Sequence, residues 1–111
     1  MTFGDDKVVY KVDGACNKYV DEVEKYNWPT PMVIEIMQLE SSCDPDAVNA
    51  HDKHEHCYGS YSLLQVSCED YKKGMSKKDP VLNIKLAYDL FLANHESFRP
   101  WSTCRLLKNC L

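Results

Sequence analysis

Six cysteines among 111 residues are the feature that most constrains how this chain can fold. An even number in so short a chain predicts up to three disulfides and therefore an oxidising compartment. Thiolate ligands for zinc are the competing explanation, but the chain has no Cys-x-x-Cys pair, the short spacing that such sites usually contain. We therefore expect disulfides. The six are Cys16, Cys43, Cys57, Cys68, Cys104 and Cys110.

Length and charge narrow the class of protein further. A chain of this length has room for one hydrophobic core, so we expect residues 1–12 to form an N-terminal arm and residues 13–111 a single domain. Seventeen acidic against 13 basic residues give a net charge of −4, which argues against nucleic acid or an anionic membrane as the main partner. We find no apolar stretch long enough for a membrane span or a signal peptide. Export would then need a signal already removed, or another route such as cell lysis.

Hydrophobic periodicity predicts a mainly α domain, stapled by disulfides, of about five helices with little β structure. The strongest helix, 30–40, opens on Thr-Pro and is apolar nearly all round, so we expect it at the centre of the core. Residues 44–60 have the polar composition of a loop, and 61–66 are predicted to be a strand or extended. The other expected helices are 15–27, 68–73, 81–94 and a last short turn at 103–110.

Glu40 is the residue that departs from its local pattern, because a carboxylate ends the most hydrophobic helix. Loss of solvation there disfavours the charged form and raises the pKa of the carboxyl group. A carboxyl group that stays protonated near neutral pH can donate its proton to a leaving group. The simpler interpretation is that Glu40 points to solvent at a frayed helix end.

Three motifs follow one another along the chain, and the first of them contains Glu40. Residues 36–49 are an apolar helix ending in Glu-Ser, followed by Asp-Pro and Ala-x-Asn; residues 62–65 are Ser-Leu-Leu-Gln; and residues 79–84 are an Asp-Pro helix opening with Asn-Ile. An Ala-Tyr pair at 87–88 and a Phe-Arg-Pro-Trp turn at 98–101 follow. Together the motifs resemble the lytic transglycosylase and goose-type lysozyme superfamily.

The resemblance implies a lysozyme-like α+β fold and cleavage of the β-1,4 bond between N-acetylmuramic acid and N-acetylglucosamine in peptidoglycan strands. Glu40 would be the general acid, with no cofactor and no metal. A transglycosylase then closes a 1,6-anhydro ring with the sugar's own 6-hydroxyl, whereas a hydrolase uses water and a second carboxylate. Asp52 and Glu55 are the candidates for that second carboxylate, although either could be an ordinary solvated charge.

The resemblance also suggests substrate-binding residues, each with a structural alternative. Gln65 would lie near the acid or make a structural hydrogen bond, and Asn49 would contact substrate or brace the loop. Ser62 stands where the family has glycine, so it would narrow the site or add a hydroxyl contact. Three aromatic residues could contact sugar rings, but aromatic side chains in small domains more often belong to the core. They are Tyr61, Tyr88 and Trp101.

Six cysteines allow fifteen pairings, and our expectation rests on position in the chain alone. Cys16–Cys110 would tie the two ends together, and Cys43–Cys57 would clamp the loop after the helix that carries Glu40. Cys68–Cys104 would then be the third disulfide. A monomer secreted to the cell wall, extracellular or periplasmic and bacterial or phage-encoded, fits these features.

Two other functions remain open at this point. The loop 51–57, His-Asp-Lys-His-Glu-His-Cys, carries zinc-type ligands and could serve a zinc-dependent cell-wall hydrolase. It lacks the His-Glu-x-x-His spacing that places two imidazoles on one helix face. A non-catalytic glycan-binding or inhibitor module would suit the acidic net charge, but Glu40 argues against it.

Overall fold

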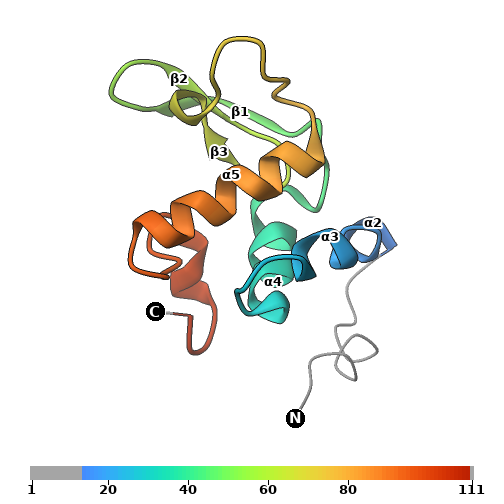
Figure 1. The fold of residues 1–111 in the computed structure, drawn as a ribbon. Helices are drawn as coiled ribbons and strands as arrows, with labels where there is room; N and C mark the ends of the chain where they lie inside the picture. Colours follow the sequence, from blue (N-terminus) through green and yellow to red (C-terminus); the bar gives the residue numbers. More distant parts are fainter. Residues whose placement is uncertain (1–13, 111) are drawn as a thin grey trace.

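The computed structural model describes residues 14–110, so the expected N-terminal arm at 1–12 lies outside the described part. Helices and strands follow one another in the order shown in Figure 1. The helices are α2 (Gly14–Asn17), α3 (Val20–Glu24), α4 (Thr30–Ser41) and α5 (Pro80–Ala93), with 3-10 helices η2 (Cys68–Asp70) and η3 (Ser102–Leu106). The strands are β1 (Val48–Lys53), β2 (Tyr58–Tyr61) and β3 (Val66–Ser67).

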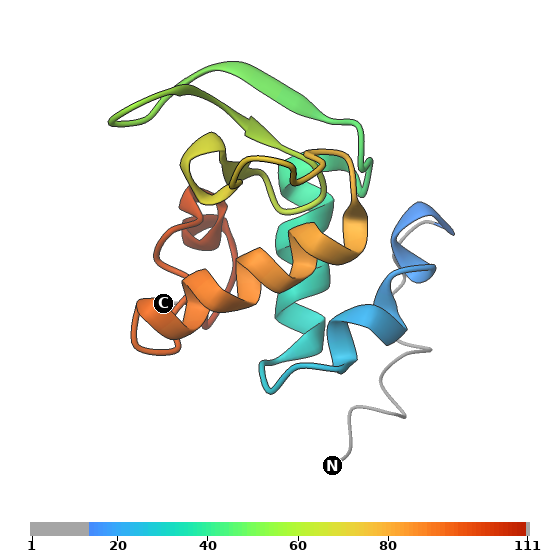
Figure 2. The ribbon, with the colours of Figure 1, turned by 45° about the horizontal axis from the view of Figure 1, so that its top comes forward.

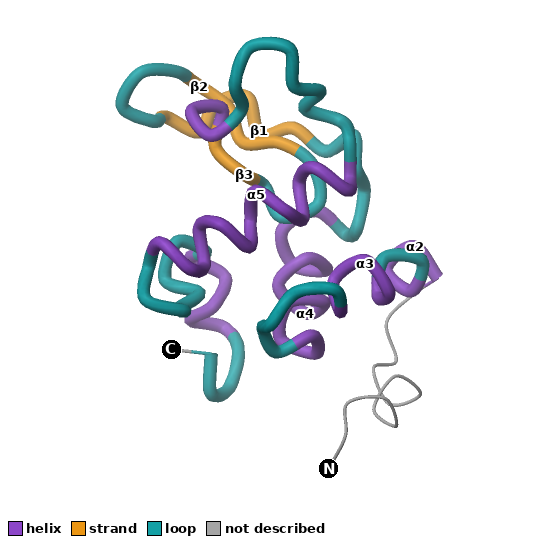
Figure 3. The backbone as a smooth tube through the Cα atoms, viewed as in Figure 1, coloured by secondary structure: helices purple, strands orange, loops and turns teal. Residues whose placement is uncertain are grey.

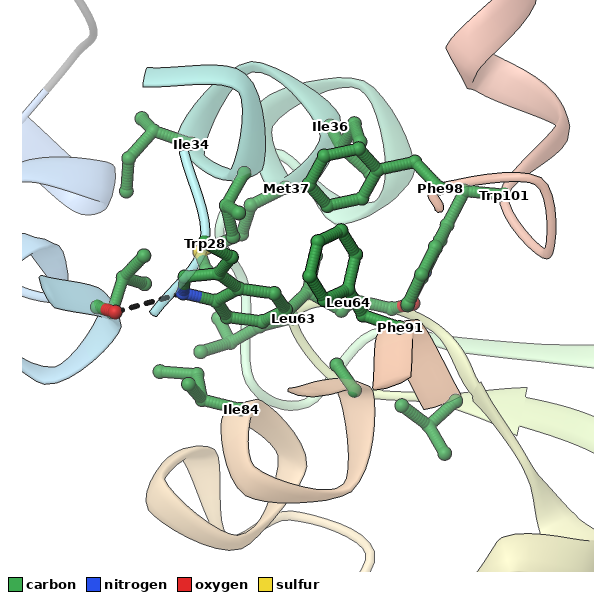
Figure 4. Packing of buried hydrophobic residues seen from close by; sticks show 14 of the residues in the cluster. Trp28, Ile34, Ile36, Met37, Leu63, Leu64, Ile84, Phe91, Phe98 and Trp101 are labelled. Carbon is green, nitrogen blue, oxygen red and sulfur yellow. Dashed lines mark hydrogen bonds between the residues drawn. The ribbon is translucent and has the colours of Figure 1, made fainter. Parts of the chain in front are cut away.

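Helix α4 supplies the centre of the core, as its composition predicts. Pro31 lies in its first turn, where a missing backbone N–H costs nothing. Four of its apolar side chains are fully buried, and Figure 4 shows three of them around Trp28 and the aromatic residues of the C-terminal half. The helix ends where Ser42 takes a left-handed conformation with φ 53°. The four buried side chains are Val33, Ile34, Ile36 and Met37.

Helix α5 runs across the front of α4 in the view of Figure 2 and contributes the opposite side of the core. Its start is capped by Asp79, whose Oδ1 accepts hydrogen bonds from the N–H groups of Val81 (3.0 Å) and Leu82 (3.3 Å). Trp28 packs edge-to-face on Phe91 of this helix, with ring centroids 5.8 Å apart. The indole N–H of Trp28 donates to the Val23 carbonyl (2.8 Å) and so joins α3 to the same core.

A three-stranded antiparallel sheet in the order β1-β2-β3 corrects the expected fold class. The prediction of about five helices with little β is wrong, because the described residues form four α-helices together with this sheet. Figure 3 shows the strands gathered above the helices. Strand β1 falls inside the expected loop at 44–60. Its side chains are almost all exposed, so no alternation of apolar residues marks it, and backbone pairing with β2 creates it.

The expected helix at 15–27 is also shorter and broken. Helices α2 and α3 are separated by a turn at residues 18–19, closed by a hydrogen bond from the Tyr19 N–H to the Cys16 carbonyl (3.0 Å). At the break, Cys16 is joined to the far end of α4 by a disulfide with Cys43. Among the described residues, no helix is both long and apolar enough to cross a bilayer.

All six cysteines are paired, which confirms the expectation of three disulfides, but each expected pairing is wrong. The bonds join cysteines that follow one another in sequence, whereas we had expected Cys16–Cys110, Cys43–Cys57 and Cys68–Cys104. Antiparallel return of the chain explains the difference, because it brings the end of α4 back to α2 and the β1–β2 turn back to η2. The observed pairs are Cys16–Cys43, Cys57–Cys68 and Cys104–Cys110.

Candidate active site

An open cavity of ≈ 380 Å³ lies between the C-terminal end of α4 and the sheet. Helix α4 contributes one carboxylate to its wall, the first two strands contribute polar side chains, and the turn before η3 contributes an indole. Three carboxylates line one space, so the chemistry of the site is acidic. The lining residues are Glu40, Asn49, Asp52, His54, Ser60, Gln65, Ser67, Asp70, Leu90, Pro100, Trp101 and Ser102.

Glu40 is half-buried in this cavity. Burial raises the pKa of its carboxyl group, the hydrogen bond from Thr103 lowers that pKa, and the negative charge of Asp52 raises it. The net direction is upward, so Glu40 holds its proton to a higher pH than an exposed glutamate. Thr103 Oγ1 donates to Glu40 Oε2 at 2.8 Å and fixes the orientation of the group.

The end of α4 is fastened, so the simpler interpretation of Glu40 at a frayed helix end is wrong. Ser41 Oγ donates to the carbonyl of Leu63 (2.7 Å), on the turn between β2 and β3, and contacts the carbonyl of Met37 (3.2 Å). The Ser42 N–H closes the last turn on the Gln38 carbonyl (2.9 Å). These bonds hold the backbone beside Glu40 against the sheet.

Asp52 faces the cavity from β1 in a small hydrogen-bond network. The Ser60 hydroxyl, on β2 and only 3% exposed, donates to Asp52 Oδ2. His54 Nε2 lies 3.0 Å from the same hydroxyl and 3.5 Å from Asp52 Oδ2. Because a hydroxyl has one hydrogen and Ser60 gives it to Asp52, His54 Nε2 must carry a hydrogen and donate it. The Ser60 hydroxyl therefore orients the Asp52 carboxylate, and His54 in turn holds the Ser60 hydroxyl.

The other candidate for a second carboxylate, Glu55, lies outside the cavity. Its side chain is 81% exposed and lies beside His56, with 3.6 Å between Oε1 and Nε2. The structure thus brings Asp52, and not Glu55, to the space that Glu40 faces. Asp70 is a third carboxylate on the wall, and its partial burial raises the pKa of its carboxyl group.

Three of the expected substrate-binding residues line the cavity: Asn49, Gln65 and Trp101. Gln65 also makes structural hydrogen bonds, because its Nε2 donates to the carbonyls of Ala47 (3.2 Å) and Ser62 (3.0 Å). Trp101 is 5% exposed, and its Nε1 donates to the Leu64 carbonyl (2.7 Å). Both therefore have the structural role that the sequence left as one alternative, and both also line the cavity.

The other three expected contacts do not line this cavity. Ser62 is fully buried with φ 70°, so its hydroxyl is not available to a sugar. The Tyr88 ring packs on Trp28, with centroids 5.2 Å apart, and belongs to the core. The Tyr61 ring lies edge-on to Tyr71, at 6.2 Å, and closes over Gly59, where any Cβ would lie 2.5 Å from the Tyr61 hydroxyl.

Thr103 and Ser60 contact the candidate carboxylates, but sequence reasoning did not single them out, and it named His54 only in the zinc alternative. Thr103 is 63 residues from its partner Glu40, and no local signal connects the two. His54 directly follows β1 and is two residues from Asp52. The alternation of side chains along a strand, continued one residue past its end, would place both on one face. That spacing was the available signal for His54, but it depended on recognising β1.

The zinc alternative loses a ligand, because Cys57 is bonded to Cys68 and has no thiolate to offer. Within residues 14–110, no group of three histidine, cysteine or acidic side chains has an arrangement that could hold a metal ion. The histidines of the loop separate instead. His54 turns to the cavity, while His56 is exposed beside Glu55.

A scan against protein-family models and searches of curated proteins and of solved structures found no match for this chain. The resemblance of its three motifs to lytic transglycosylases and goose-type lysozymes stays a prediction. The case for function therefore rests on the geometry of the cavity.

Proposed function

We propose that the chain is a glycosidase that cleaves the β-1,4 bond between N-acetylmuramic acid and N-acetylglucosamine in peptidoglycan, with Glu40 as general acid. One observation carries the proposal: a half-buried carboxyl group with a raised pKa lines an open cavity that a second, oriented carboxylate also lines. Pairs of carboxyl groups in such contrasting environments are typical of glycosidases. The motifs around Glu40 support the same class of enzyme.

In the proposed reaction Glu40 gives its proton to the glycosidic oxygen as the bond to the anomeric carbon breaks. Because Oε2 accepts the hydrogen bond from Thr103, the acidic proton is carried on Oε1. Positive charge develops on the sugar ring, and the Asp52 carboxylate stabilises it. Glu40, now ionised, then accepts a proton from the attacking hydroxyl group.

The attacking group distinguishes a hydrolase from a transglycosylase. Water gives a product with a reducing end, whereas the 6-hydroxyl of the muramic acid gives a 1,6-anhydro ring. Asp52, oriented by the Ser60 hydroxyl, is suited to position water, which favours hydrolysis. Mass spectrometry of the released fragments tests this choice, since the anhydro product is lighter by one water.

The proposal also places the enzyme outside the cytoplasm, at the cell wall. Three disulfides are typical of proteins in oxidising compartments, which is where peptidoglycan lies. Both a secreted enzyme and one released by lysis during phage infection fit this location.

The decisive experiment compares peptidoglycan cleavage by the native chain, Glu40→Gln and Glu35→Gln. Glu35 lies on the same helix but is exposed and away from the cavity, so its variant controls for the loss of one charge. General acids typically contribute 10²–10⁴-fold to rate, so Glu40→Gln should lower the release of soluble fragments by at least about 100-fold. Glu35→Gln should retain activity.

Full activity in Glu40→Gln would refute the assignment of the general acid. Native protein that sediments with insoluble peptidoglycan but releases no fragments would instead indicate a glycan-binding module. Both variants should give the native near-ultraviolet circular dichroism spectrum, which shows that any loss is chemical.

A further inference from the structure

The chain has two arginines, and both line one cavity beside the candidate active site. Arg99 and Arg105 border a hollow of ≈ 370 Å³, and every other basic residue of the chain is a lysine. The guanidinium group is a planar fork of donors that binds carboxylate or phosphate through two parallel hydrogen bonds, which the ammonium group of lysine cannot do. The placement of both arginines here therefore indicates an anion site.

Both arginines line this cavity, and the part of the chain that the structure describes brings no counter-ion to either of them. Within residues 14–110 no acidic side chain lines the hollow, and no ion pair involves either arginine. Two like charges that share a cavity repel each other, so an arriving anion would be bound more favourably than at either one alone.

This cavity shares a wall with the one that holds Glu40. Pro100, Trp101 and Ser102 line both. The wall is held firmly, because Trp101 is hydrogen-bonded to Leu64 (2.7 Å) and the disulfide Cys104–Cys110 closes the turn that carries Arg105. A ligand bound across the Glu40 cavity could therefore place a neighbouring group between the arginines without rearrangement of the backbone.

The acidic charge of the Glu40 cavity means that a nearby anion site would favour the binding of an anionic substrate. Glu40, Asp52 and Asp70 line the first cavity, and the chain carries a net charge of −4. Peptidoglycan strands bear peptide stems with free carboxylates on their muramic acid residues. The acidic cavity would repel those carboxylates, unless positive charge lay at the point where the peptide stems extend out of the cavity.

We propose that Arg99 and Arg105 form a subsite for the carboxylates of a peptide stem next to the bond that is cleaved. The inference rests on the proposed function and deepens it, because it makes the enzyme selective for strands with charged stems. Phosphodiesters of other wall polymers share the chemistry of an anion, but the peptide stem is carried by the muramic acid at the cleaved bond itself. We therefore assign the subsite to the stem carboxylates.

Direct binding to the Glu40→Gln protein, measured by calorimetry, tests the subsite separately from catalysis. The probes are short glycan strands with their stems, the same strands with the stem carboxylates converted to amides, and poly(glycerol phosphate). We expect the strands with free carboxylates to bind at least about tenfold more tightly than the amidated strands. Adding Arg99→Gln and Arg105→Gln should abolish that preference.

Two matched variants complete the design in the same Glu40→Gln background. Lys73→Gln with Lys78→Gln removes the same charge from exposed sites outside the cavities and should retain the preference. Arg99→Lys with Arg105→Lys keeps the charge but loses the paired hydrogen bonds of the guanidinium group. The preference for free over amidated stem carboxylates should therefore fall only in part.

Three results would overturn the inference: equal affinity for free and amidated stems, a preference that survives in the double glutamine variant, or tighter arginine-dependent binding of poly(glycerol phosphate). Cleavage of peptidoglycan by the native chain is measured independently. If cleavage is absent while the arginine-dependent preference remains, the proposed reaction fails and the subsite stands; the reverse result refutes the subsite alone.

Discussion

Glu40 receives opposing influences from the groups around it. Burial against the core and the charge of Asp52 both favour the protonated form, whereas the hydroxyl of Thr103 favours the ionised form. A general acid needs such a balance, because it must be protonated before the reaction and able to release its proton during it. The Thr103 contact joins η3 to α4, so the C-terminal turn helps to set the acidity of the proposed catalytic group.

Thr103→Val should raise the pKa of Glu40, because valine has nearly the same shape but cannot donate to Oε2. The acid form would then persist to higher pH, and the alkaline limb of the pH profile of kcat/KM should move upward. Titration of the Glu40 carboxyl carbon by ¹³C NMR measures the pKa directly. Thr30→Val, the same change at the other end of α4, is the control and should leave this pKa in place. A downward shift with Thr103→Val would contradict the assigned role of the hydrogen bond.

At the scale of elements, α4 and α5 are specified by local signals and the sheet is not. Both helices begin at a proline in the first turn, and both supply buried apolar side chains to one core. Strand β1 carries polar, exposed residues and depends on β2 for its hydrogen bonds. Asn83 connects helix α5 to the sheet. Its side chain accepts a hydrogen bond from the Leu64 N–H (2.8 Å) and donates one to the Tyr61 carbonyl (3.0 Å).

Removal of the α5 cap should measurably lower stability. Asp79→Ala leaves the N–H groups of Val81 and Leu82 without their acceptor, which typically costs about 1 kcal/mol of the free energy of unfolding. Asp89→Ala on the same helix is the control, because it breaks an exposed pair with Lys85 (3.0 Å) that solvent screens, so it should lower stability less than Asp79→Ala. Urea unfolding measures both. Equal losses from the two variants would show that the cap is not a significant stabiliser.

For the molecule as a whole, the disulfides form three local closures distributed along the chain. Cys16–Cys43 fastens α2 to the end of α4, Cys57–Cys68 fastens the β1–β2 turn to η2, and Cys104–Cys110 closes the C-terminal turn. A hydrophobic core of this size gives only marginal stability without such links. Each closure lies in a segment that leads to the candidate site, so the same bonds stabilise the fold and hold the walls of the cavity.

The three disulfides should stabilise the protein in the order of the loops they close. Replacing both cysteines by alanine should cost about 3.5 kcal/mol for Cys16–Cys43 and about 2 kcal/mol for Cys104–Cys110, with Cys57–Cys68 between them. Their sequence separations are 27, 6 and 11 residues. Urea unfolding of the three double variants gives the order. A larger loss for Cys104–Cys110 than for Cys16–Cys43 would show that restriction of the unfolded chain is not the main effect.

The sequence by itself determined the features that depend on near neighbours. Proline openings and apolar runs predicted α4 and α5 closely, because helices are made from bonds four residues apart. The even number of cysteines predicted that all would pair. Glu40 stood out because a carboxylate at the end of an apolar helix is unusual, and its half-buried position with a raised pKa agrees with that reasoning.

Only the tertiary structure decided which distant groups meet. Strand β1, the disulfide partners and the choice of Asp52 over Glu55 all depend on how the chain turns back on itself, and so does the inclusion of Tyr88 in the core. The hydroxyl that tunes Glu40 comes from 63 residues away. Such contacts leave no periodic trace in the sequence, because their energy arises from packing and hydrogen bonds between segments that become neighbours only on folding.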